Sequence, residues 1–547
     1  MNEFKDKTYG QALAILTDRF ADREALIFRG IRFSFRDVRR QCDLAAARLG
    51  ALGLRPGDKV AIWLPNRPEL IWYWLGAAAT GLVAVIMNTR LKRDEVAYQL
   101  RQSDSRAVIV PGEGSFRDFL ADLAVICPEA RTGQPGNISC AELPLLRHII
   151  VCDQVDRSYG GVHDFSGPPA EDLAVPPYAT DPLQAAMIAY SSGTTALPKG
   201  AILNHSVWRK VADHGDRFRQ TAEDRLYLAV PLFGILASIN GVLTFWSRGS
   251  CVILEERFEP LNALKVISAE RCTAAYLLPL MVEQIANHPE RTKYDLGRLR
   301  TGIVVTTDPE ILRLAAREIG MREVFTSYGM TETSTAVTRT WWSDPLEARL
   351  NSNGKPFPDI EVRVVDPETN GSLPTGESGE IQVKGYCVTP GYYNKPEETA
   401  RTFTSDGWFK TGDAGYFLND GSLKFTSRLK DSYKHNGFNV STTEVESILL
   451  QHPAVKAAAV VGLPDRSHGE IGFAFVIPRH ETSAEGVLDF LRARLASFKL
   501  PRTILFVEEF PTTAGTGKVQ KFQLKEMALA HLQASAPEAP HAQLVMP

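Results

Sequence analysis

Short hydrophobic runs alternate with amphipathic stretches of helical period between residues 20 and 330. Such runs are typical of buried strands, and their alternation with helices predicts parallel sheets that carry helices on both faces. The runs that we interpret as strands are KVAIWLP (59–65), LVAVIM (82–87), RAVIV (106–110), QAAMIAYSS (184–192), GSCVILEE (249–256) and CTAAYLLP (272–279). The pattern therefore predicts an α/β protein built on large, doubly wound mixed sheets.

The longest apolar run, LIWYWLGAAATGLVAVIMN (70–88), carries no charge and reaches the lower limit of a membrane-spanning length. Gly76 and Gly81 interrupt it, and its second half has the composition of a buried strand. We interpret the run as a buried helix that ends near Gly81 and is followed by a strand. No transmembrane segment is expected.

The pattern of hydrophobic and turn residues changes after residue 350. EVRVVD (361–366) and GEIQVKG (379–385) lie between turn residues and predict a small, mostly antiparallel, barrel-like β unit. Helix and strand mix again after about residue 430. STTEVESILLQH (441–452) predicts a capped amphipathic helix, because Glu444 follows Ser441 by three residues. VKAAAVVGLPD and IGFAFVIP predict paired strands, and the end from about 534 has the composition of a disordered tail.

Composition narrows the class of protein. A chain of 547 residues exceeds one ordinary core, and a net charge of −3 argues against nucleic acid as a partner. The seven cysteines include no C-x-x-C pair and are odd in number, which favours reduced cysteines over a disulfide or zinc framework. Charges near the N-terminus stand where a secretion signal would be apolar. A cytoplasmic location is expected.

One polar stretch, YSSGTTALPKG (190–200), cannot fill a core. Its hydroxyls, its glycines and the single Lys199 offer donors and a cation, which together suit a polyphosphate. A flexible surface turn is the alternative when the stretch is taken alone.

Four segments occur in order along the chain: YSSGTTALPKG (190–200), SYGMTETS (327–334), GWFKTGDAGYFLNDGSLKFTSRLKD (407–431) and TAGTGKVQK (513–521). Together they resemble the adenylate-forming superfamily of acyl-CoA synthetases, luciferases and peptide-synthetase adenylation domains. The resemblance implies an N-terminal adenylation domain over 1–429, with its β-barrel-like part at about 350–429. It also implies a hinge at Lys430, a small mobile α+β lid over 431–533 and a tail over 534–547.

The resemblance assigns most of the nucleotide site. The residues that would contact ATP or AMP are Ser191, Ser192, Gly193, Thr194, Thr195, Lys199, Tyr328, Gly329, Met330, Asp413 and Arg428. Thr331 would bind the α-phosphate, and Glu332 would help to hold Mg²⁺, a hard cation that prefers oxygen. The alternative for Glu332 is a carboxylate at a helix start. Ala196 departs from the family, which usually has glycine there, and its Cβ stiffens the loop.

Further residues are assigned to the two reaction steps. Lys518 would stabilise negative charge as the substrate carboxylate attacks the α-phosphate. Lys434 would also be catalytic. For the thioester step the resemblance implicates Asn436, Gly437 and Asn439 just past the hinge, where Gly437 would let a pantetheine arm pass close to the backbone.

The acyl pocket departs from the family pattern. The residues expected to line it are Gly234, Ile235, Asn240, Tyr276, Val304, Val305 and Thr306. Gly234 stands where the family often has histidine, and the β-branched run from Val304 replaces a Gly/Ala-rich one, so the pocket would be opened at one end and narrowed at the other. The segments 234–241 and 275–282 carry no charged residue, which favours a neutral, apolar acid.

The sequence thus predicts an AMP-forming acid–thiol ligase that uses ATP, Mg²⁺ and coenzyme A on a hydrophobic, small-molecule carboxylic acid. An enzyme that loads a carrier protein instead of coenzyme A is the first alternative. A nucleotide-binding sensor with degraded catalysis is the second, and the retained Lys518, Glu332 and Asp413 argue against it. The oligomeric state is left open, with a homodimer among the options.

Overall fold

The computed structural model describes residues 2–112, 115–154, 158–168, 173–191, 198–306, 308–429, 432–435, 438–465, 468–495, 497–513 and 519–534. The chain divides into two compact units. The first comprises residues 1–363, 382–411 and 417–424, and the second comprises residues 364–381, 412–416 and 425–547. The domain boundaries read from the sequence stay a prediction.

Two seven-stranded sheets form the framework of the first unit. One has the order β7 (Val162–Asp164), β6 (His148–Val151), β5 (Ser105–Val110), β3 (Lys59–Ile62), β4 (Val83–Ile86), β8 (Ala185–Ser191) and β9 (Lys199–Asn204). The other has the order β14 (Glu323–Phe325), β13 (Thr301–Val304), β12 (Ala274–Leu277), β10 (Arg225–Leu228), β11 (Cys251–Leu254), β1 (Glu24–Phe28) and β2 (Ile31–Ser34). All neighbours run parallel except β8 with β9 and β1 with β2. The predicted α/β class with mixed sheets is confirmed.

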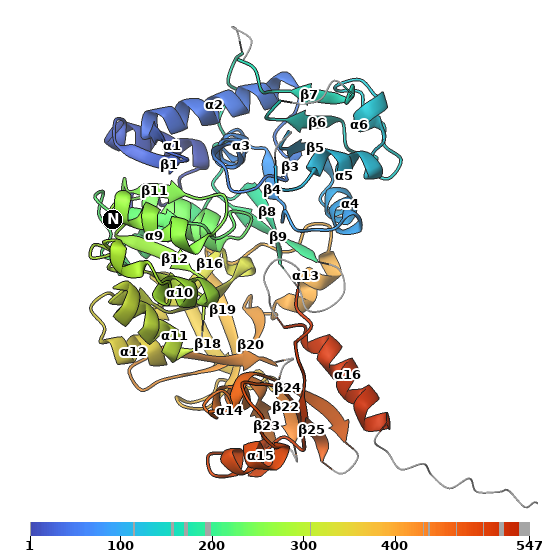
Figure 1. Cartoon of the computed structure of the whole chain (residues 1–547). Helices are drawn as coiled ribbons and strands as arrows, with labels where there is room; N and C mark the ends of the chain where they lie inside the picture. The colour runs from blue at the N-terminus through green and yellow to red at the C-terminus, as the bar shows by residue number, and fades with distance from the viewer. Residues whose placement is uncertain are drawn as a thin grey trace, which may run out of the picture. The chain divides into compact units, whose positions relative to one another are not determined.

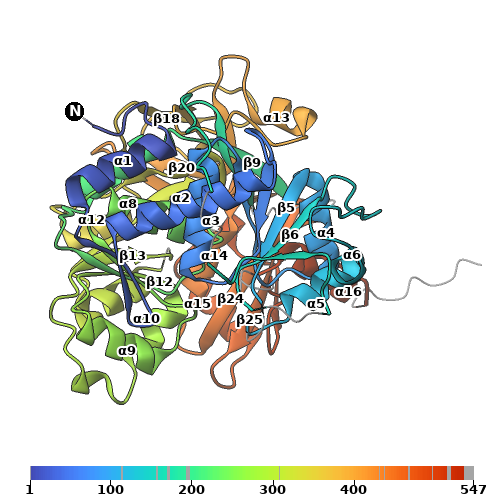
Figure 2. The same ribbon diagram turned by 90° about the horizontal axis from the view of Figure 1, so that it is seen from above.

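Helices cover both faces of the first sheet, as its hydrophobic strands require. Figure 2 shows α1 (Tyr9–Phe20), α2 (Phe35–Ala51) and α3 (Pro68–Ala79) on one side of β5 and β6, and α4 (Arg93–Gln102), α5 (Phe119–Ile126) and α6 (Glu129–Thr132) on the other. The remaining α-helices of this unit are α7 (Val207–Arg217), α8 (Thr244–Trp246), α9 (Pro260–Ala269), α10 (Pro279–Ala286), α11 (Pro309–Leu314), α12 (Leu346–Asn351) and α13 (Pro396–Thr402). Two π-helices, η1 (Leu236–Leu243) and η3 (Ala315–Ile319), and two 3₁₀ turns, η2 (Arg291–Lys293) and η4 (Thr331–Thr333), complete it.

The long apolar run folds as predicted. It forms the buried helix α3, which turns at Gly81 (φ +81°) into the buried strand β4. The left-handed conformation at this turn favours glycine. Among the described residues, none of the helices combines the length and the apolar character that a membrane crossing requires.

Smaller sheets follow along the chain (Figure 1). The strands β15 (Ser327–Met330), β16 (Thr335–Arg339) and β17 (Lys355–Pro356) pair antiparallel. The next four form a sheet in the order β18 (Ile360–Val365), β19 (Gly379–Gly385), β20 (Phe409–Phe417) and β21 (Leu423–Arg428). In the described part of this stretch the strands make one four-stranded sheet, and no closed barrel is present.

The second unit ends in a sheet with helices. Its strands follow the order β23 (Phe438–Ser441), β22 (Ser432–His435), β25 (Gly469–Pro478) and β24 (Val455–Asp465), and β26 (Thr503–Phe506) pairs with β25. The helical elements are α14 (Thr442–Leu449), α15 (Ala484–Arg492), α16 (Lys521–Ala534) and the 3₁₀ turn η6 (Ser497–Lys499). The predicted pairing of β24 with β25 is confirmed.

The cap of α14 is also confirmed, because the Ser441 hydroxyl accepts a hydrogen bond from the Glu444 backbone N–H. The predicted end of this helix at residue 452 is wrong. The helix stops at Leu449, because the N–H groups of Gln451 and His452 bond to the carbonyls of Ile448 and Leu449, three residues earlier, before Pro453.

Candidate active site

The strand–turn–strand of β15, η4 and β16 carries the sequence SYGMTETS in a tightly constrained backbone. A Cβ at Gly329 would lie 2.2 Å from the carbonyl oxygen of Thr335, so only glycine fits between the two strands. Ser334 and Thr335 have φ values of +55° and +121°, which are strained for residues with side chains. The Ser334 hydroxyl donates to the carbonyl of Cys387 and helps to hold this turn. Such strain persists where surrounding contacts over-determine the backbone.

The side chain of Glu332 is held by a loop that lies about 60 residues further along the chain. Tyr392 donates its phenolic hydrogen to Glu332 Oε1 at 2.9 Å, and the N–H of Thr389 donates to the Glu332 carbonyl at 2.7 Å. The Thr389 hydroxyl is in turn 2.8 Å from the carbonyl of Ile202 in β9. Glu332 is therefore a largely buried carboxylate whose position is fixed by hydrogen bonds from a second segment.

Lys199 reaches the same tyrosine from the end of the hydroxyl-rich stretch. It begins β9, its ammonium pairs with Glu398 at the start of α13, and its Nζ lies 5.3 Å from the centre of the Tyr392 ring. The structure thus places the predicted phosphate lysine over the ring of Tyr392 and the predicted magnesium carboxylate at its hydroxyl. The backbone of Ser191 pairs with Lys199 across β8 and β9, while Ser192, Gly193, Thr194 and Thr195 lie outside the described residues.

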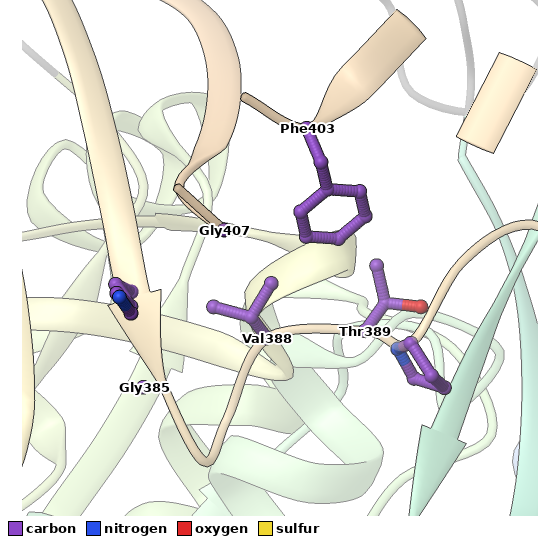
Figure 3. Close-up of a pocket in the computed structure, with 7 residues that line it drawn as sticks. Gly385, Val388, Thr389, Phe403 and Gly407 are labelled. Atoms are coloured by element: carbon purple, nitrogen blue, oxygen red, sulfur yellow. The ribbon is translucent and has the colours of Figure 1, made fainter. Parts of the chain in front are cut away.

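The loop from β19 to α13 also borders a surface pocket (Figure 3). Figure 3 shows the Phe403 ring across from Val388 and Thr389. The other lining residues are Lys384, Gly385, Pro390 and Gly407. None of these is among the residues that the sequence predicts for the site.

Tyr328, Gly329 and Met330 lie in β15, and the Tyr328 ring is nearly buried. Tyr328 faces Thr338 across the sheet. In the second unit, Asp413 of β20 is buried and pairs with Arg428 of β21, whose Nε lies 2.9 Å from Asp413 Oδ1. The predicted ribose carboxylate therefore has a cation beside it.

The residues predicted for the second step are described only in part. Lys434 in β22 pairs with Asn439 in β23 through the backbone, and nothing is described of either side chain. Lys430, Asn436, Gly437 and Lys518 lie outside the described residues.

The predicted acyl pocket centres on the π-helix η1 and the strand β12. Tyr276 is fully buried and donates to the carbonyl of Asn240 at 3.0 Å, so these two residues meet as expected for one wall. Gly234 lies just before η1 beside Ile235, and a Cβ placed there would find only the carbonyl of Pro231, at 3.4 Å. Space at Gly234 is therefore open.

The three residues predicted to narrow the acyl pocket differ in burial. Val304 is buried in β13, but Val305 is 47% exposed. Thr306 accepts a hydrogen bond from the N–H of Asp308 through its hydroxyl, as part of the turn into α11. Of these three residues, Val304 alone contributes a fully buried apolar side chain.

The sequence analysis missed a buried group of four basic residues, two of which contact Asn240. Lys210, His214 and Arg217 lie on one face of α7, and Arg339 ends β16. Burial lowers the pKa of Lys210 to about 8 and that of Arg339 to about 10. The spacing of i, i+4 and i+7 on α7 is a signal that sequence alone offered, because three such residues share one helix face.

Comparison with known proteins defines the class. The sequence model of the AMP-binding enzyme family matches residues 15–393, and that of the AMP-binding enzyme C-terminal domain matches residues 444–518. The chain belongs to the AMP-binding enzyme family, and the predicted membership of the adenylate-forming superfamily is confirmed.

Particular relatives cover nearly the whole chain. The mitochondrial medium-chain acyl-CoA ligase of Mus musculus is 32% identical over 546 residues, which are 96% of this chain and 88% of that protein. An anthranilate CoA ligase in complex with anthranoyl-AMP has a TM-score of 0.82 at 27% identity and covers 97% of this chain and 98% of its own. The O-succinylbenzoate coenzyme A synthetase of Bacillus subtilis, in complex with ATP and magnesium ion, has a TM-score of 0.80 at 26% identity and covers 95% and 100%.

Proposed function

We propose that this enzyme activates a hydrophobic carboxylic acid with ATP and then transfers the acyl group to coenzyme A. The observation that carries the proposal is the contact of Tyr392 with both Lys199 and Glu332 in a chain of the AMP-binding family. Tyr392 thereby brings the Lys199 cation and the Glu332 carboxylate together where the hydroxyl-rich stretch ends. The similarity to acyl-CoA and aryl-CoA ligases over the whole chain supports the same chemistry.

In the first step, an oxygen of the substrate carboxylate attacks the α-phosphorus of ATP and pyrophosphate leaves. Lys199 and the hydroxyls of residues 191–195 would hold the leaving phosphates, and Thr331 the α-phosphate. Lys518 would offset the negative charge that grows on the nonbridging oxygens. Asp413 would accept hydrogen bonds from the ribose hydroxyls, with Arg428 beside it.

Mg²⁺ fits the donor set, because Glu332 presents a carboxylate and hard cations prefer oxygen ligands; when bound, it would neutralise phosphate charge. The residues of this chain have a separate task. Tyr392 and the N–H of Thr389 hold Glu332 in one orientation before the nucleotide arrives. Orientation fixed in advance lowers the cost of binding.

In the second step, the thiol of coenzyme A attacks the acyl-adenylate carbonyl and AMP leaves. A rotation at Lys430 would exchange Lys518 for the segment of Lys434, Asn436, Gly437 and Asn439, since the two steps need different geometries. Domain limits at 429 and 431, and a cytoplasmic location, belong to this proposal. Transfer to a carrier protein remains the alternative acceptor reaction.

For the acid, the described pocket residues favour an apolar body. Tyr276 and Val304 are buried, and Gly234 leaves space where a larger side chain would stand. We therefore expect a bulky acid, cyclic or aromatic, in preference to a slim chain.

The test is ATP–pyrophosphate exchange with a panel of aryl, medium-chain, long-chain and polycyclic acids. Acid-dependent exchange is the expected result, and exchange absent from the whole panel would reject the ligase in favour of a sensor. Acids that support exchange are then incubated with either coenzyme A or a carrier protein. Thioester formed only with the carrier protein would overturn the assignment of the acceptor.

A further inference from the structure

Four basic side chains are buried together in the first unit, without an ion pair in the described part of the chain. Lys210, His214 and Arg217 project from α7 toward β16, where Arg339 is completely buried. Among the described residues, no aspartate or glutamate forms an ion pair with any of the four. Buried cations are normally paired, so each of these needs an acceptor.

Two of the cations are satisfied by backbone. The Lys210 ammonium donates to the carbonyl of Thr333, which anchors the strained turn beside Glu332. The Arg217 guanidinium donates to the carbonyl of Arg339 at 2.5 Å and to that of Pro356 at 2.8 Å. Lys210 therefore supports the turn η4, and Arg217 supports the strands β16 and β17.

Arg339 is different. One of its amino groups, Nη2, lies 3.2 Å from Asn240 Oδ1, but Nε and Nη1 have no hydrogen-bond acceptor. The Phe218 ring lies 4.5 Å from the guanidinium carbon and stabilises its face. A ring satisfies the face of a guanidinium and leaves its in-plane N–H groups without partners. Unpaired buried donors of this kind are costly unless a ligand completes them.

Arg339 lies beside a residue of the proposed acyl pocket, because its Nη2 bonds to Asn240. His214 Nδ1 is 3.2 Å from the same Asn240 oxygen, so Arg339 and His214 converge on one side chain of η1. Tyr276 contacts the backbone of that residue. In the sheet, Arg339 faces Ser327, the residue before Tyr328.

The charge of Arg339 persists at neutral pH. Burial lowers the pKa of Arg339 to about 10, which still leaves it protonated. The groups near it are Asn240, Tyr276, the rings of Phe218 and Phe357, and the basic side chains of Lys210, His214 and Arg217. The pKa of His214 is held well below its usual range by burial and by the neighbouring cations, so it stays neutral. Arg339 therefore presents a positive charge to an incoming group, and the cations of Lys210 and Arg217 lie near it.

We propose that Arg339, with Asn240 and His214, recognises an oxygen acceptor at the end of the acid remote from the carboxylate that is activated. This inference rests on the proposed function, and it adds a polar terminus to an otherwise apolar substrate. The acceptor is a second carboxylate or a carbonyl, because both accept in-plane N–H groups of a guanidinium. Arg339 is a specificity-determining residue that touches the substrate far from the reacting atoms.

The experiment compares acids of matched skeleton. One series is decanoic, oxodecanoic and decanedioic acid, and the other is cyclohexanecarboxylic acid with its para-oxo and para-carboxy derivatives. The values of kcat/KM in pyrophosphate exchange are measured for the wild type, Arg339→Met and Arg339→Lys. We expect the wild type to prefer an oxygen-bearing acid by about 10- to 100-fold within a series, as hydrogen bonds to a charged group imply. Arg339→Met should remove the preference, and Arg339→Lys should keep it best for the diacid.

Arg349→Met is the matched control. Arg349 is another buried arginine of the same unit, and its Nε also has no acceptor. Its two amino groups donate to the carbonyls of Val324 and Arg322, and none of its described hydrogen bonds goes to a residue of the proposed pocket. It should leave the preference intact even if stability falls. A wild type that prefers the plain acids, or an Arg339→Met enzyme with unchanged preference, overturns the proposal.

Binding is measured separately as the shift in melting temperature that each acid produces. A shift with the oxygen-bearing acids in the wild type that Arg339→Met loses supports the inference even without turnover. Turnover of plain acids with no such shift rejects the inference alone. Neither turnover nor a shift with any acid rejects both the inference and the proposed ligase.

Discussion

The hydrogen bond from Tyr392 to Glu332 offers a direct test of the proposed magnesium ligand. Tyr392→Phe removes one hydroxyl and keeps the ring against which Lys199 rests. Glu332 is largely buried, so water replaces the lost donor poorly. The carboxylate should then rotate away from the orientation in which it meets the cation.

The size of the effect follows from the contact. The hydroxyl lies 2.9 Å from Oε1, which is a good distance for a hydrogen bond to a carboxyl oxygen. Hydrogen bonds to charged groups contribute about 1.5–3 kcal/mol, and loss of a partner that orients a metal ligand weakens metal affinity by about 10- to 100-fold. We expect the Mg²⁺ concentration at half-maximal activity to rise about tenfold or more.

The assay is pyrophosphate exchange titrated with Mg²⁺ at saturating ATP and acid. The control is Tyr393→Phe, the same substitution one residue later, where the hydroxyl donates to Asp104 at the same distance of 2.9 Å. That variant should leave the magnesium titration unchanged. An unshifted titration in Tyr392→Phe, or an equal shift in the control, would refute the role of Glu332.

Four further predictions concern other parts of the molecule. Lys518→Ala should slow adenylation by roughly two orders of magnitude and still transfer acyl from supplied acyl-adenylate, because it removes a transition-state cation from the first step only; failure to use the supplied intermediate contradicts this. Lys430→Pro should leave exchange largely intact and block thioester formation, because proline fixes φ at the hinge; equal loss of both half-reactions would falsify the hinge placement. Gly234→His should lower kcat/KM most for the bulkiest acids in a size series, whereas a uniform loss means that the position does not face the acyl group. Burial lowers the pKa of His205 from 6.5 to about 4, while its Nδ1 accepts from the N–H of Tyr9. The folded state therefore resists protonation, and stability present above pH 6.5 should fall by up to about 3 kcal/mol as the pH drops from 6.5 to 4. Urea unfolding should show a shallower fall in His205→Gln, and an unchanged slope would contradict the assignment.

The fold was predictable where local sequence and burial agree. Strands β3, β4, β5, β11 and β12 are continuous apolar runs bounded by turn residues, and such runs have few other stable arrangements in water. The end of α14 was extended too far in the prediction, although Pro453 disfavours helical backbone at His452. The N–H groups of Gln451 and His452 accordingly bond to the carbonyls of the residues three positions earlier.

Residues of the candidate site were likewise predictable only where the local sequence identifies them. Glu332 and Lys199 were found because each belongs to a short motif with its own spacing. Their contacts with Tyr392 and Glu398 could not be predicted, because those two residues come from segments far along the chain and belong to no recognisable motif. Arg339 was missed for a related reason. An arginine at the end of an apolar strand is usually interpreted as exposed to solvent, but here the packing of α7 against β16 buries the side chain.

The π-helix η1 has a consequence for how the specificity of this pocket can change. The N–H of Asn240 donates to the carbonyl of Ile235, five residues earlier, so one turn holds an extra residue. Because the π-turn absorbs this extra residue, deleting a single residue between these two would restore α-helical spacing and leave the flanking turns in register. Asn240 would then stay beside Arg339 and His214, while the widened turn between Ile235 and Asn240 would close. Single-residue insertions and deletions in this turn would therefore change the width of the pocket wall while the residues that bind the remote end of the acid keep their places.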